Sequence, residues 1–127
     1  MRPLGVTEHW DKLKQPKWTT FRVPRKDKDW QVGEQVQVVY KPRSKQRESL
    51  GVAEIISKES KTFIAVEEAD AIADGFESCL DMWMWLKEAH KGIKMTAPIN
   101  KLTLRWADIA HLTTEQNFKE EYNNESY

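Results

Sequence analysis

The stretch Lys17–Arg22 carries an amine, a hydroxyl and a guanidinium within six residues, and these groups can do chemistry together. If the stretch is a strand, its side chains alternate between two faces, so Trp18, Thr20 and Arg22 share one face. Lys17 begins the strand directly after a proline, where its long stem can turn to either face. The three polar groups can therefore converge within roughly 7 Å of backbone. Such a grouping can bind an anion or activate a hydroxyl.

Length and composition indicate one globular domain followed by a tail. The chain has 127 residues, of which 39% are hydrophobic and 31% charged, which is polar but not typical of a disordered chain. We expect the domain to cover residues 1–110. Residues 111–127 are polar and acidic, and we expect a frayed tail there.

Charge is unevenly distributed, although the formal net charge is zero. Between positions 11 and 47, eleven basic residues face only four acidic ones. A basic half favours an anionic partner, whereas the alternative is an ordinary set of solvated surface lysines. The turn 41–48 shows the same ambiguity, because Lys41 and Arg43 suit either phosphate contacts or a solvated hairpin loop.

Several classes of site are disfavoured. A single cysteine, Cys79, excludes an intramolecular disulfide and a multi-cysteine zinc site, and the three histidines lack ligand spacing. We therefore expect no metal and no cofactor. No apolar run approaches the roughly 20 residues of a membrane span, and the start lacks a signal-peptide segment, so we expect a cytoplasmic protein without membrane contact.

Periodicity predicts an α+β fold in which a small mixed or antiparallel sheet curls into a barrel flanked by helices. A short amphipathic turn at 10–14 would pack Trp10 and Leu13 on the core. A bulge is expected at Gly51 and a tight turn at Gly33. The predicted strands are 17–23, 35–40, 49–57, 61–67 and 100–108.

A helix is predicted over 78–90, with Ser78 as its N-cap and Gly92 beyond its end. Its apolar residues form a wide surface, on which Leu80, Trp83, Met84 and Leu86 fall close together. Packing against the sheet is the ordinary interpretation of this surface. The alternative is that Trp83 or Trp85 protrudes to stack on a base or ring.

The order of these motifs resembles a known family. Lys-x-x-Thr-x-Arg at 17–22, a charged loop, Val-Gly-Glu, a β-branched strand and then Ala-Asp-Gly-Phe-Glu-Ser at 73–78 resemble the ASCH domain of the PUA-like superfamily. The resemblance covers about residues 10 to 108. It implies a small β-barrel with flanking helices, a cleft beside the first motif, and a nucleic-acid-binding role.

Within that family the pattern is most similar to the bacterial acetylcytidine amidohydrolases. Their functional lysine and threonine correspond to Lys17 and Thr20 here. Their glutamate corresponds to Glu77 if the helix is aligned by its glutamate, or to Asp74 if it is aligned by the apolar residues that follow.

Two functions follow from these residues and the resemblance. The first is RNA or nucleotide binding in a basic cleft around Lys17, Thr20 and Arg22, with weak ribonuclease action as a variant. The second is metal-independent hydrolysis of acylated nucleosides such as acetylcytidine, in which Thr20 is the nucleophile, Lys17 the base and Glu77 the carboxylate. The expected ligand-binding residues are Trp18, Arg22, Arg25, Lys41, Arg43 and Asp74. The ordinary structural alternative is that Lys17 and Glu77 form a surface ion pair, which contributes under about 1 kcal/mol to the stability of the fold.

Overall fold

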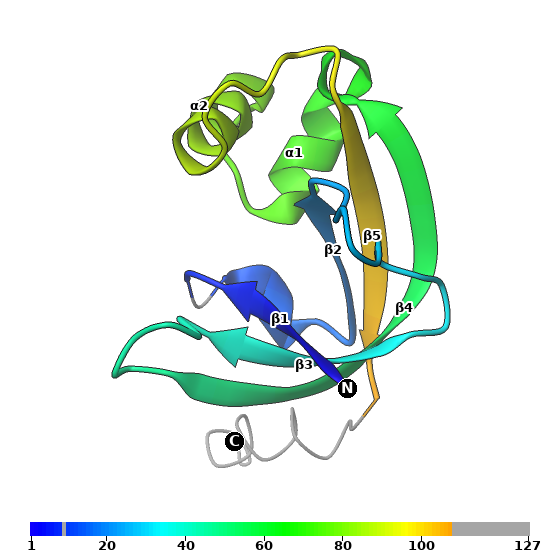
Figure 1. Cartoon of the computed structure of the whole chain (residues 1–127), viewed down its shortest axis with the longest axis vertical. Helices are drawn as coiled ribbons and strands as arrows, with labels where there is room; N and C mark the ends of the chain where they lie inside the picture. Colours follow the sequence, from blue (N-terminus) through cyan, green and yellow to red (C-terminus); the bar gives the residue numbers. More distant parts are fainter. Residues whose placement is uncertain (9, 108–127) are drawn as a thin grey trace.

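A five-stranded mixed sheet forms the body of the protein, and a computed structural model describes residues 1–8 and 10–107 (Figure 1). The first two strands in the sheet order pair in parallel, and the other neighbours are antiparallel. The two outer strands are not paired with each other, so the sheet of the described residues is open. The α+β class is confirmed, but closure into a barrel is not. The sheet order is β1 (Arg2–Val6), β3 (Gln35–Tyr40), β4 (Glu48–Thr62), β5 (Pro98–Trp106) and β2 (Lys17–Arg22).

The long strands β4 and β5 bend the sheet into an arc, with β1 and β3 at one end and the helices at the other (Figure 1). Where the sequence predicts two strands, 49–57 and 61–67, the structure has the single strand β4, followed by the short 3₁₀ helix η2 (Phe63–Ala65). The polar residues at 58–60 do not end the strand. They stay in it because β5 pairs with them, for example Lys101 with Glu59.

Strand β1 is not among the predicted strands. It contains a proline and a glycine, and only Leu4 and Val6 give an alternating apolar signal. Both side chains are buried in the core, and β1 pairs in parallel with β3. Tertiary packing therefore overrides a weak local preference.

Two helices cover the end of the sheet at β2. The first, α1 (Glu68–Asp74), is also missing from the prediction, because its seven residues are too few to show a helical period. The second, α2 (Cys79–Ala89), begins as predicted, with the Ser78 hydroxyl accepting a hydrogen bond from the Asp81 amide at 3.0 Å. Its C-cap is His90, two residues before the glycine expected there.

The predicted buried face of α2 is partly wrong. Met82 and Leu86, one helical turn apart, are the buried residues, whereas Leu80 and Met84 are 68% and 58% exposed. Trp83 is half-buried, with its ring 4.8 Å from that of Phe63. The helix contacts the rest of the protein along one narrow stripe, so a wide apolar surface in the sequence does not mean a wide buried one.

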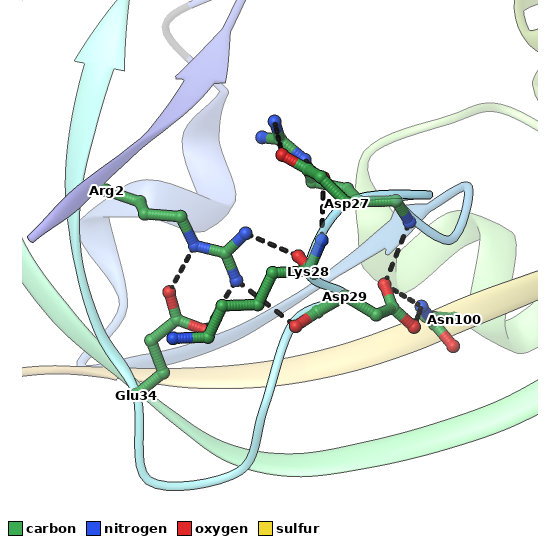
Figure 2. Close-up of polar contacts among 7 residues, drawn as sticks. Arg2, Asp27, Lys28, Asp29, Glu34 and Asn100 are labelled. Atoms are coloured by element: carbon green, nitrogen blue, oxygen red, sulfur yellow. Dashed lines mark hydrogen bonds and ion pairs between the residues drawn. The ribbon is translucent and has the colours of Figure 1, made fainter.

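The loop 23–34 is fastened across the sheet by charged and amide side chains (Figure 2). Arg2 forms two hydrogen bonds with the Glu34 carboxylate, at 2.7 and 2.8 Å, and also donates to the carbonyl oxygens of Lys28 and Asp29. Asp29 accepts hydrogen bonds from Asn100 at 3.0 and 3.1 Å. This network fixes the loop that leaves β2 and returns to β3.

None of the helices in the described part of the chain is both long enough and apolar enough to cross a membrane.

Candidate functional site

A cavity of about 470 Å³ lies on the concave side of the arc, between β1 and the helices. Its walls come from β1, the segment 7–12, β2, the loop 23–34, the turn 41–48, α1 and α2. The strands β1 and β2 are the two outer strands of the sheet, and both line this cavity. Because segments distant in sequence converge here, this is the best candidate for a binding site in the described residues.

An ion pair between Lys12 and Asp74 lies at the floor of this cavity. The Lys12 ammonium contacts an Asp74 carboxylate oxygen and donates to the backbone carbonyl of Thr19 at 2.8 Å. The two side chains are only 10% and 5% exposed. Lys12 belongs to the 3₁₀ helix η1 (Asp11–Lys14), which the buried Leu13 anchors to the core. Asp74 is the last residue of α1, so the pair ties three elements together.

A glycine allows the chain to pack closely beside this pair. Gly75 ends α1 with φ of +114°, a conformation that other residues rarely adopt. A Cβ atom there would lie 2.8 Å from the Trp10 ring. The glycine therefore turns the chain out of α1 and also lets the indole of Trp10 cover the turn.

Thr20 and Arg22 lie on one face of β2, as the alternation predicts. The Arg22 Nε donates a hydrogen bond to the Thr20 hydroxyl at 3.2 Å, and both residues line the cavity. Thr20 is 5% exposed and Arg22 is partly buried. Within residues 1–8 and 10–107, the two terminal guanidinium nitrogens of Arg22 have no hydrogen-bond or carboxylate partner.

Burial dominates the electrostatics of the floor. It lowers the pKa of Lys12, although Asp74 opposes this, and it lowers the pKa of Arg22. Burial likewise raises the pKa of Asp74, against the effects of Lys12, Arg22 and a hydrogen bond with the Phe21 backbone. In all three groups the loss of hydration outweighs the attraction between opposite charges. Shifts of this kind are typical of functional sites.

Aromatic rings form the wall of the cavity. The Phe76 ring lies between two indoles, with centroid distances of 5.7 Å to Trp10 and 5.8 Å to Trp85. Trp30 lines another side, with the Arg25 guanidinium 5.6 Å from its ring centroid. The exposed side chains of Arg25 and Arg43 also line the cavity, at its rim.

Five of the nine residues predicted for the site line this cavity: Thr20, Arg22, Arg25, Arg43 and Asp74. The four others do not. Lys17 is exposed at the start of β2, paired with Arg105 of β5, and Glu77 is exposed before α2. Trp18 is buried in the core with its ring 5.6 Å from that of Trp106, and the Lys41 amine donates to Gln46 at 3.2 Å.

The structure thus distinguishes between the two carboxylates that the sequence leaves open. Asp74 is buried in the cavity wall, whereas Glu77 is exposed and outside it. The lysine at the floor is Lys12, which the sequence analysis misses. The pattern at 10–14 draws attention only to its apolar residues, and no local signal connects Lys12 to a partner 62 positions away.

Comparisons of the chain with protein-family models, curated proteins and solved structures found no match. The resemblance to the ASCH domain therefore depends on the short motifs themselves. In the described ranges, no cluster of three or more His, Cys, Asp or Glu side chains is arranged to hold a metal ion.

Proposed function

We propose that the cavity binds a nucleotide-like ligand, either a free nucleotide or a terminal nucleotide of RNA. The observation that carries this proposal is the combination, in one cavity, of a cationic floor and an aromatic wall. The resemblance to the ASCH domain supports the same conclusion, and with it we propose that the curved sheet is an open variant of the PUA-like barrel.

The size and lining of the cavity suit a nucleotide. Its volume of about 470 Å³ falls within the range of roughly 300–1,000 Å³ that is usual for small-molecule sites. The rings of Trp10, Phe76 and Trp85 offer surfaces on which a base can stack, and stacking contributes about 1–3 kcal/mol per base. Arg22, Arg25 and Arg43 supply positive charge for a phosphate.

Quenching of tryptophan fluorescence by cytidine 5′-monophosphate, adenosine 5′-monophosphate and a single-stranded RNA tests this proposal. We expect saturable binding that weakens at least about tenfold in Trp85→Ala, in accordance with the loss of one stacking partner. Affinity for the RNA should fall steeply as salt rises, because phosphate contacts release counterions. Absence of saturation by all three ligands at millimolar concentration would contradict the proposal.

A second function, hydrolysis of an acylated nucleoside, is favoured by one observation. Lys12, whose pKa burial lowers, contacts the carbonyl of Thr19, the residue next to Thr20. A lysine with a lowered pKa can serve as a base near neutral pH. In this proposal Lys12, rather than Lys17, takes the role of base, and Asp74 takes that of the carboxylate.

The steps of this reaction balance. The Thr20 oxygen attacks the acetyl carbonyl while neutral Lys12 takes the hydroxyl proton. Lys12 then gives that proton to the exocyclic nitrogen as the C–N bond breaks, which leaves an acetyl ester on Thr20. Water hydrolyses the ester to acetic acid, with Lys12 accepting one proton of the water and returning it to the threonine oxygen. The acid then releases its own proton to solvent and leaves as acetate. Asp74 holds the lysine in place.

Hydrolysis of acetylcytidine, followed by chromatography, tests this second function. We expect turnover to be lost in Thr20→Val and Lys12→Ala but retained in the matched control Lys17→Ala. Loss of turnover in Lys17→Ala with retention in Lys12→Ala would restore the role that the resemblance gives to Lys17. No turnover by the wild type at high enzyme concentration would leave nucleotide binding as the proposed function.

A further inference from the structure

We infer that the ligand of this cavity binds with an oxyanion innermost, held in a bidentate manner by Arg22, and with its aromatic part nearer the opening. This inference rests on the proposed function and deepens it, because it assigns which end of a nucleotide-like molecule is buried. It also identifies Arg22 as the residue that selects charged ligands over neutral ones.

The charges at the floor of the cavity do not balance one another. Lys12 and Asp74 compensate each other through a direct contact. Arg22 lies close enough for its charge to affect the pKa of both, yet it forms no ion pair with any described carboxylate. The three groups together therefore retain one positive charge, on the partly buried side chain of Arg22. A buried charge without a partner is costly, and an anionic group on the ligand supplies the missing partner.

The geometry of the Arg22 guanidinium suits an anionic group that has two oxygens. Thr20 occupies Nε, so the donors that remain are those of the two terminal nitrogens. A guanidinium presents its donors as a rigid planar fork, which matches the two oxygens of a phosphate or carboxylate. The bond to Thr20 also holds the fork in place before the ligand arrives. Binding therefore requires little ordering of this side chain.

The charged groups and the outer part of the aromatic wall differ in exposure. Arg22 is partly buried beside Asp74, which is 4% exposed, whereas Trp85 at the outer end of the aromatic wall is 42% exposed. Charge at the rim is also less available to an anion, because Arg25 is paired with Asp27 at 3.3 Å. Arg43 is exposed, so solvent and salt screen its interactions. An oxyanion is thus bound more strongly at the floor than at the rim.

The experiment compares cytidine 5′-monophosphate, cytidine and inorganic phosphate by isothermal titration calorimetry. For the wild type we expect the monophosphate to bind at least about tenfold more tightly than cytidine, because its phosphate can accept charge-assisted bidentate hydrogen bonds. We call this ratio of affinities the phosphate advantage. Arg22→Gln should abolish that advantage. Arg22→Lys, which keeps the charge but not the fork, should lose most of it. Arg43→Ala should reduce it far less than Arg22→Gln does. The matched control Arg105→Gln, an exposed arginine of β5 outside the cavity, should retain it.

The alternative outcomes separate the two proposals. If Arg43→Ala abolishes the advantage and Arg22→Gln retains it, the phosphate binds at the rim and the inference is wrong. A different result is that neither cytidine nor its monophosphate binds, but phosphate shifts the Arg22 Nε–H resonance in a nitrogen-15 spectrum. That result would support the oxyanion site and contradict the proposal that the ligand is a nucleotide. If phosphate also fails to shift that resonance, the inference is overturned. Circular dichroism and thermal melting confirm that each variant is folded.

Discussion

Two groups of charged residues in this protein differ in how fully their charges are compensated. In the network around Asp29, every carboxylate has cationic or amide partners, and the network fastens a loop (Figure 2). At the cavity floor, burial shifts every pKa against the charged form, and Arg22 interacts with Asp74 only at a distance, without an ion pair to any carboxylate among the residues described. Complete compensation is typical of a structural role, and the incomplete compensation at the floor supports the proposal that a ligand binds there.

Asp29 shows how compensation works in the network. Burial opposes its ionisation, but hydrogen bonds from the Arg25 amide, the Lys58 amine and Asn100 outweigh it and lower its pKa to about 2. At the floor, Asp74 has only Lys12, the more distant charge of Arg22 and a hydrogen bond with the Phe21 backbone, and its pKa is raised. The same side-chain type thus shifts in opposite directions in the two regions.

The largest expected effect comes from Asp74→Asn. Removing this carboxylate leaves Lys12 and Arg22 as two buried cations, so we expect the free energy of unfolding to fall by about 3–5 kcal/mol. Lys12→Met should lower the free energy of unfolding by less, because the Asp74 carboxylate can then compensate the charge of Arg22. Urea denaturation at neutral pH measures the free energy of unfolding of both variants. Equal losses in the two variants would show that Arg22 does not share in this charge balance.

The next largest effect concerns the network, and Asp29→Asn measures it. Because the folded-state pKa of Asp29, about 2, lies below the ordinary 3.8, the network stabilises the fold above about pH 4 and this stabilisation is lost as pH falls towards 2. The lowered pKa of Asp29 corresponds to about 2 kcal/mol in the free energy of unfolding. Urea denaturation at several pH values should show this loss in the wild type, and a smaller one in the variant. An identical pH dependence would contradict the network's role.

A smaller effect, of opposite sign, is expected for Arg22→Met. An apolar side chain of similar length removes a partly buried charge that forms no ion pair with a described carboxylate, so the free energy of unfolding should stay the same or rise by about 1 kcal/mol. The preference for cytidine 5′-monophosphate over cytidine should be lost in the same variant. A more stable variant that has lost this preference would establish that Arg22 lowers the stability of the ligand-free protein and serves ligand binding. A loss of about 2 kcal/mol or more, approaching that of a broken buried pair, would instead make Arg22 structural.

The smallest effects are expected for Lys17→Ala and Glu77→Ala. Both side chains are exposed and outside the cavity, so affinity for cytidine 5′-monophosphate should change by less than about twofold. The same titration that measures Arg22→Gln measures these variants. A change of about tenfold or more in either would place the site nearer to the positions given by the ASCH resemblance.

Patterns among residues close together in the sequence are sufficient to predict part of the fold and part of the candidate site. The alternation in β2 placed Thr20 and Arg22 on one face, and Ser78 was identified as a helix cap. The apolar alternation of β5 was also correct, since Leu102 and Leu104 are buried. These features depend on residues within a few positions of one another, and short-range geometry determines them.

Tertiary structure decided which charged groups share the cavity. Many lysines and carboxylates in the sequence look equivalent, and only the packing of η1 against α1 joins Lys12 to Asp74 while leaving Lys17 and Glu77 in solvent. The same packing determines that β1 is a strand and which stripe of α2 is buried. The physical reason is that burial and long-range pairing set the energy of a charge, and neither is encoded in the spacing of nearby residues.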